Sequence, residues 1–148
     1  MSIFNKQKSK ANNMCFTYFV NVLIPYWSDN QIPLIQVYPH EIEEKCKNMP
    51  DGFLKWLLNC GYFEEYTLWS WKATYKFDYY LYKYEAENFF PQYETMKLDY
   101  LRAYRENEIN ALDYVLKMKS LHHKHERYTR VSTMTETEFI NFQKSRYE

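Results

Sequence analysis

The segment LHHKHER, residues 121–127, is the densest cluster of side chains able to do chemistry. His122 and Glu126 are four residues apart, so on a helix they share a face and could reach one metal ion. The segment has no H-E-x-x-H pattern and no third ligand at a recognisable spacing. We therefore interpret it as a solvated, cation-rich helix end, where positive charge is favourable beside the helix dipole. The sequence predicts no bound metal and no cofactor.

Other catalytic signatures are equally sparse. Cys46 lies between Lys45 and Lys47, whose charges would favour a thiolate, but no base is placed beside it by the sequence. It is interpreted as a small core residue on an amphipathic helix. The only glycines are Gly52 and Gly61, which excludes the glycine-rich phosphate loops and the G-x-S-x-G nucleophile elbow. These observations predict a protein that is not an enzyme.

A local excess of cations extends from Lys117 to Arg130, where Glu126 is the single acidic residue. Such a segment suits docking on an acidic protein patch or on a nucleic-acid backbone. The predicted partner-binding residues in it are Lys117, Lys119, His122, His123, Lys124, Arg127 and Arg130. In the alternative interpretation, the segment packs on the acidic block from Glu41 to Glu65, either within the fold or in a homodimer.

Aromatic residues are concentrated between Tyr66 and Tyr84. Strict alternation predicts a half-buried strand over residues 66–77, with Trp69, Trp71, Tyr75 and Phe77 facing the core. From Asp78 the helical period fits better, so a helix is predicted over residues 79–90, capped by Asp78 and stopped by Pro91. Tyr79 and Tyr82 share its apolar face. Tyr80 and Tyr84 lie off that face and are the remaining candidates for partner contact.

The N-terminal half is predicted to supply the rest of a small antiparallel sheet. Residues 1–13 are interpreted as a flexible basic arm, and residues 14–148 as a single α+β domain. Alternation from Phe16 to Ile24 predicts a strand, which would form a hairpin with residues 32–38. Short helices are expected after Pro39 and over FLKWLLNC, the second ending at Gly61 as the C′ residue.

The C-terminal half is predicted to be mostly helical. Residues 92–131 contain neither glycine nor proline and keep a helical apolar stripe. They favour one long helix or an antiparallel pair that breaks near Asn107. Thr135 and Glu138 form a capping box ahead of a last short helix, FINFQKSR.

Composition restricts the functional classes. The 19 cations and 19 anions balance, which argues against a strongly acidic DNA mimic and a strongly basic nucleic-acid coat. No apolar run approaches the roughly 18 residues of a membrane span, and no secretory signal is evident. The three cysteines lack a C-x-x-C pair, which is typical of reduced thiols in the cytoplasm.

A bias toward Phe, Tyr, Ile, Asn and Lys, with few Gly, Ala, Arg and Pro, is typical of AT-rich genomes such as those of many phages and mobile elements. Abundant Tyr and Trp are typical of protein interfaces. The leading hypothesis is therefore a cytoplasmic phage or mobile-element accessory protein that binds and inhibits a host protein, for example a defence factor. The alternative is a single-stranded DNA- or RNA-binding protein that stacks bases on tyrosines and contacts phosphates through Lys and Arg.

Overall fold

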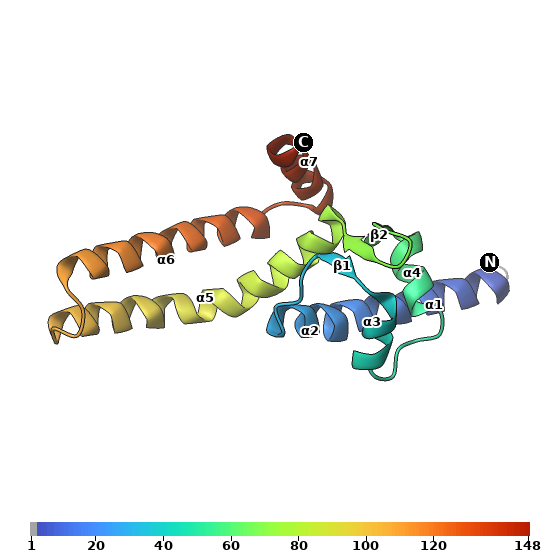
Figure 1. The fold of residues 1–148 in the computed structure, drawn as a ribbon, viewed down its shortest axis with the longest axis horizontal. Coiled ribbons are helices and arrows are strands. Elements are labelled where there is room, and N and C mark those ends of the chain that lie inside the picture. Colours follow the sequence, from blue (N-terminus) through green and yellow to red (C-terminus); the bar gives the residue numbers. More distant parts are fainter. Residues whose placement is uncertain (1–2) are drawn as a thin grey trace.

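The computed structural model describes the backbone of residues 3–148, and the side chains of Lys10 and of residues 12–148. Helices dominate it, and a small sheet lies beside them (Figure 1). The elements in chain order are α1 (Ile3–Tyr18), the π-helix η1 (Phe19–Leu23), α2 (Ile24–Asp29), β1 (Ile35–Val37), α3 (Pro39–Lys45), α4 (Phe53–Asn59), β2 (Phe63–Glu65), β3 (Trp71–Ala73), α5 (Tyr75–Arg105), α6 (Ala111–Ser132) and α7 (Glu136–Tyr147).

The α+β class and the helical C-terminal half are confirmed, and the sheet is small and antiparallel as predicted. Its strand order is β1-β3-β2, with Ile35 opposite Lys72 and Phe63 opposite Ala73. The predicted N-terminal hairpin is wrong, because only its second half, residues 32–38, contributes a strand. Residues 14–24 are helical and lie in α1, η1 and α2.

The pattern of buried side chains explains why residues 14–24 form a helix and not a strand. Cys15, Phe19, Leu23 and Trp27 are all buried and recur every four residues, which is a helical period. The same segment also alternates in the period of a strand, at Phe16, Tyr18, Val20 and Ile24. Only the helix buries Cys15, Phe19, Leu23 and Trp27 together, so packing in the core favours the helix. Residues 3–13, predicted as part of a flexible arm, belong to α1.

The predicted strand over residues 66–77 shortens to Trp71–Ala73. Thr74 rather than Asp78 caps α5, and its hydroxyl accepts a hydrogen bond from the Phe77 N–H. Helix α5 also passes through Pro91 to Arg105, so the predicted stop at that proline is wrong. Of the two predicted alternatives after residue 92, the structure has the antiparallel pair with a break near Asn107, since α5 ends at Arg105 and α6 begins at Ala111. The Thr135 capping box at the start of α7 is confirmed.

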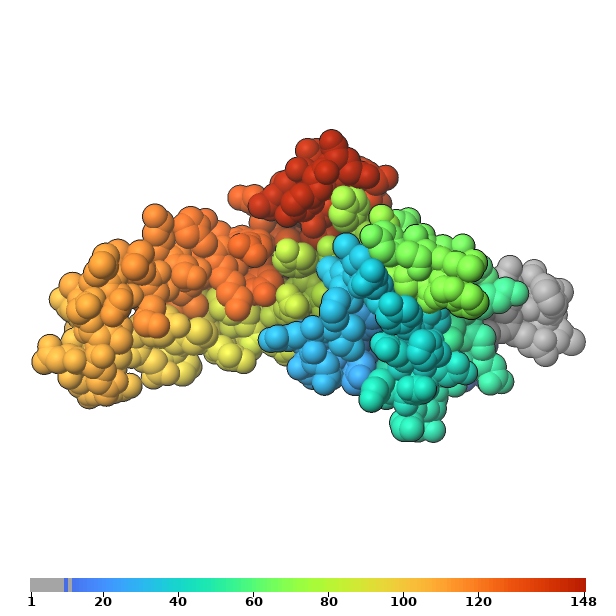
Figure 2. All heavy atoms as spheres, in the orientation of Figure 1, coloured from blue at the N-terminus to red at the C-terminus, as the bar shows by residue number. Residues whose placement is uncertain are grey.

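The main core lies where α1, η1, α2, α4 and the sheet meet the start of α5. Phe77 is completely buried there, with its ring centroid 5.2 Å from that of Trp27 and 4.9 Å from that of Phe63. A second cluster joins α5 to α6 through Phe89, Tyr93, Leu121 and Tyr128. Beyond it, none of residues 94–120 is buried, and the α5–α6 pair forms an arm at one end of an elongated molecule (Figure 2).

Candidate binding surface on helix α6

Helix α6 carries most of the predicted partner-binding residues. Its N-cap residue is Asn110, whose side-chain oxygen accepts a hydrogen bond of 2.8 Å from the Asp113 N–H. Leu121 and Tyr128 are buried against α5, which runs antiparallel beside it (Figure 1). The face of α6 opposite these two residues therefore points outward.

Three of the predicted residues contact α5. The Lys117 Nζ lies 5.6 Å from the centre of the Tyr100 ring, and the Lys124 Nζ lies 5.2 Å from that of Phe89. The His122 Nδ1 is 2.7 Å from the Tyr93 hydroxyl. All three side chains also remain exposed, so they border the outward face while they tie α6 to α5.

The other four, Lys119, His123, Arg127 and Arg130, follow one another at spacings of four, four and three residues and share the outward face. All four are exposed. Among the described residues, no carboxylate lies within ion-pair distance of them, and the acidic block from Glu41 to Glu65 makes no ion pair with α6. A shallow hollow on this face is lined by Leu116, Lys119, Ser120, His123, Lys124 and Arg127.

The outward face is apolar toward the N-terminal end of α6. Leu112, Val115 and Leu116 are exposed to 66%, 58% and 55%. An apolar group followed by a cationic group thus extends from Leu112 to Arg130, about 27 Å along the helix at 1.5 Å per residue. We call this strip the α6 face. Exposed apolar side chains grouped beside polar ones are characteristic of interaction sites.

Tyr80 and Tyr84 lie away from α6's outward face and are engaged within the fold. The half-buried Tyr80 donates a hydrogen bond of 2.8 Å to Glu136, and burial together with this bond raises its pKa. The half-buried Tyr84 donates a long hydrogen bond of 3.5 Å to Asp29. The Tyr80 ring also packs against the rings of Phe19, Tyr62 and Tyr79, so stacking of a base on it would require this packing to change. Tyr82 belongs to the helical face and packs against Tyr128 and Phe139.

Sequence reasoning missed a second exposed apolar group, at the turn between β2 and β3. Trp69, predicted to lie in the core, is 77% exposed, and Leu68 is 86% exposed. The turn is ordered by the buried Ser70, whose hydroxyl lies 2.6 Å from that of Thr67 and whose carbonyl accepts from the Tyr66 N–H. The hydroxyl residues at positions 67 and 70 were the available signal for a turn.

The other chemical candidates have different surroundings. Cys46 is buried, and desolvation raises the pKa of its thiol despite the flanking lysines, so the thiolate is disfavoured. Within the part of the chain that the structure describes, no group of three His, Cys, Asp or Glu side chains could hold a metal ion. No helix among those residues is both long and apolar enough to span a bilayer.

No protein-family model matches the chain, and comparisons with curated proteins and with solved structures find no match either. The α6 face is the largest group of exposed apolar and cationic side chains on a single described element.

Proposed function

We propose that the protein acts by binding another protein through the α6 face, without catalysing a reaction. One observation carries the proposal: exposed Leu112, Val115 and Leu116 continue directly into exposed cations on the same side of one helix, and these cations form no ion pair among the described residues. Arg130 also lies over the Phe142 ring of α7, 5.9 Å from its centre. A complementary partner would present an apolar groove bordered by carboxylates. Docking of an amphipathic helix face into such a groove is a recurrent mode of protein recognition.

The apolar half of the α6 face favours a protein over a nucleic acid. Phosphates are contacted by cations and by hydrogen-bond donors, whereas leucine and valine side chains gain little from a solvated backbone. They gain roughly 25 cal/mol for each Å² of apolar surface removed from water by a protein partner. The compositional bias of the chain further supports a role as a phage or mobile-element accessory protein that blocks a host protein.

The proposal is tested by affinity capture from lysate of the native host, with four immobilised forms of the full chain. Leu112→Ser/Leu116→Ser removes two of the three exposed apolar side chains of the α6 face, and Lys119→Glu/Arg127→Glu reverses the charge at two of its cationic positions. Leu98→Ser is the matched control, since Leu98 is an exposed leucine, 65% accessible, on the neighbouring helix α5. All four substituted side chains of the face are exposed, so circular dichroism should show an unchanged fold.

We expect wild type and Leu98→Ser to recover the same protein, and both α6 double variants to recover at least about tenfold less of it. Recovery of a second copy of the chain alone would identify the face as a homodimer interface. Equal recovery by all four forms would contradict the proposal. A fifth form, Leu68→Ser/Trp69→Ser, tests the other exposed apolar group. Loss of the partner in this form alone would place the contact at the β2–β3 turn instead.

Single-stranded nucleic acid is a second candidate, favoured by the unpaired cations of the α6 face. If Lys119, Arg127 and Arg130 each neutralised a phosphate, the binding constant for mixed oligonucleotides would fall roughly twentyfold between about 50 and about 200 mM salt. Fluorescence anisotropy measures this dependence, and Lys119→Glu/Arg127→Glu should abolish binding. A flat titration at low salt would eliminate this candidate.

A further inference from the structure

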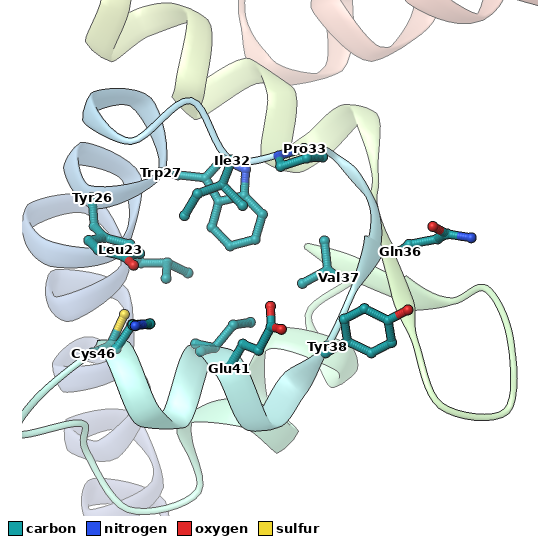
Figure 3. Close-up of a pocket in the computed structure, with 12 residues that line it drawn as sticks. Leu23, Tyr26, Trp27, Ile32, Pro33, Gln36, Val37, Tyr38, Glu41 and Cys46 are labelled. Carbon is teal, nitrogen blue, oxygen red and sulfur yellow. The ribbon is translucent and has the colours of Figure 1, made fainter.

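A pocket that shares no lining residue with the α6 face lies between α2, β1 and α3 (Figure 3). Its volume is about 270 Å³. The walls are mainly apolar and come from Leu23, Trp27, Ile32, Val37 and Ile42. Glu41 and Lys45, both exposed and one helical turn apart on α3, line the same pocket, and the Glu41 carboxylate points into the opening (Figure 3).

The wall contains an unsatisfied hydrogen-bond donor. Trp27 is only 2% exposed, and its indole Nε1 has no hydrogen-bond partner in the part of the chain that the structure describes. An indole N–H can only donate, and a buried donor without an acceptor is destabilising. In Figure 3 this nitrogen lies on the side of the ring nearest Ile32, whose side chain is half-buried.

We propose that this pocket binds a small neutral molecule that combines an aromatic or branched apolar group with a carbonyl acceptor. The carbonyl accepts the Trp27 indole N–H when the Ile32 side chain moves aside, and the apolar group fills the space between Leu23 and Ile42. A dry apolar cavity of about 150 Å³ holds benzene, so the larger volume here accommodates a ring with a short substituent.

The charges around the pocket favour a neutral ligand. Glu41 and Lys45 carry opposite charges, so the pair attracts neither anions nor cations selectively. Trp27 supplies one neutral donor, and a carboxylate buried against it would lose far more hydration than a single hydrogen bond restores. A ketone or amide oxygen is desolvated at much smaller cost and satisfies the donor.

Acetophenone and α-methylstyrene are suitable probes, because they have nearly the same shape and differ in the presence of the carbonyl oxygen. Each is titrated into the full chain labelled with ¹⁵N, and the four indole N–H signals are followed by NMR. The Trp27 signal is assigned by its absence in Trp27→Phe. We expect acetophenone to shift this signal selectively and downfield, and to bind about three- to tenfold more tightly than α-methylstyrene.

Two variants separate the hydrogen bond from general apolar binding. Trp27→Phe keeps an aromatic ring but lacks the donor, so both probes should bind it with equal affinity. Because that substitution lies in the core, Ile32→Ala provides an independent measurement: it uncovers the indole nitrogen and should increase the preference for acetophenone. Equal affinity of both probes for the wild-type chain, or shifts confined to the other three indoles, would overturn the proposal.

Discussion

Asp78 is a half-buried carboxyl group in the first turn of α5. Loss of hydration, and secondarily the nearby carboxyl group of Glu85, raises its pKa from 3.8 to about 6. Between pH 3.8 and about pH 6, the Asp78 carboxyl group is therefore protonated in the folded state and ionised in the unfolded state. Stability contributed by this proton is present below pH 4 and is lost as the pH rises to about 6.

Asp78→Asn should therefore stabilise the protein at neutral pH. A difference of about two pKa units corresponds to about 3 kcal/mol, and loss of the favourable charge at the helix N-terminus offsets up to about 1 kcal/mol. We expect a net gain of about 2–3 kcal/mol at pH 7 that disappears by pH 4, measured by urea unfolding. Asp99→Asn, at an exposed position on the same helix, is the control. An equal effect of Asp78→Asn at both pH values would contradict this explanation.

At the residue scale, alternation predicted one core aromatic correctly and another wrongly. Phe77 is completely buried, as predicted, but it lies in the first turn of helix α5 and not in a strand. Trp69 has the same alternation and is exposed, because the chain turns between Thr67 and Ser70 before the strand begins. The apolar spacing of a sequence indicates which side chains share a face. It carries no information about a turn that is stabilised by hydrogen bonds of two hydroxyl side chains.

At the scale of elements, predictions succeeded where a local signal fixed a boundary. The Thr135–Glu138 capping box begins α7, and α5 ends just before Asn107, which adopts a left-handed conformation with φ of 61°. They failed where packing outweighed the local signal, as in residues 14–24 and at Pro91. Phe89 and Tyr93 pack on α6 from either side of Pro91, and this packing keeps the helix continuous through the proline.

Pro91→Ala should consequently stabilise the protein. The proline is exposed, lacks the N–H that would bond to the carbonyl of Glu87, and costs up to about 3 kcal/mol in a helix interior. We expect the free energy of unfolding to increase by about 1–3 kcal/mol in chemical denaturation. Gln92→Ala, at the exposed neighbouring position, should change it by less than about 0.5 kcal/mol. A destabilised Pro91→Ala variant would show that the proline is required in α5.

At the scale of the molecule, the end of the α5–α6 arm has almost no core of its own. No side chain from residue 94 to residue 120 is buried. The two helices contact there through side chains that are not buried, such as Tyr104 and Tyr114, whose ring centroids are 5.0 Å apart. Arg102 of α5 forms an ion pair of 3.1 Å with Glu108 in the loop that connects the two helices. Surface ion pairs contribute little, so this end should open independently of the main core.

Hydrogen exchange tests this difference in local stability. Amides of residues 98–118 should exchange at least about tenfold faster than those of residues 79–89, which lie in the part of α5 that packs in the buried clusters. Uniform protection along α5 and α6 would contradict it. The apolar half of the α6 face lies on this weakly held end, so a bound partner should also slow its exchange.

Site-specific photo-crosslinking tests the central claim, that the α6 face binds another protein, most directly. A benzophenone amino acid placed at Leu116 and, as the control, at Leu98 is irradiated in the native host. The account predicts one discrete protein adduct from position 116, lost when Lys119→Glu/Arg127→Glu is added, and none of that adduct from position 98. No adduct from position 116, or an adduct that nuclease treatment removes, would contradict it.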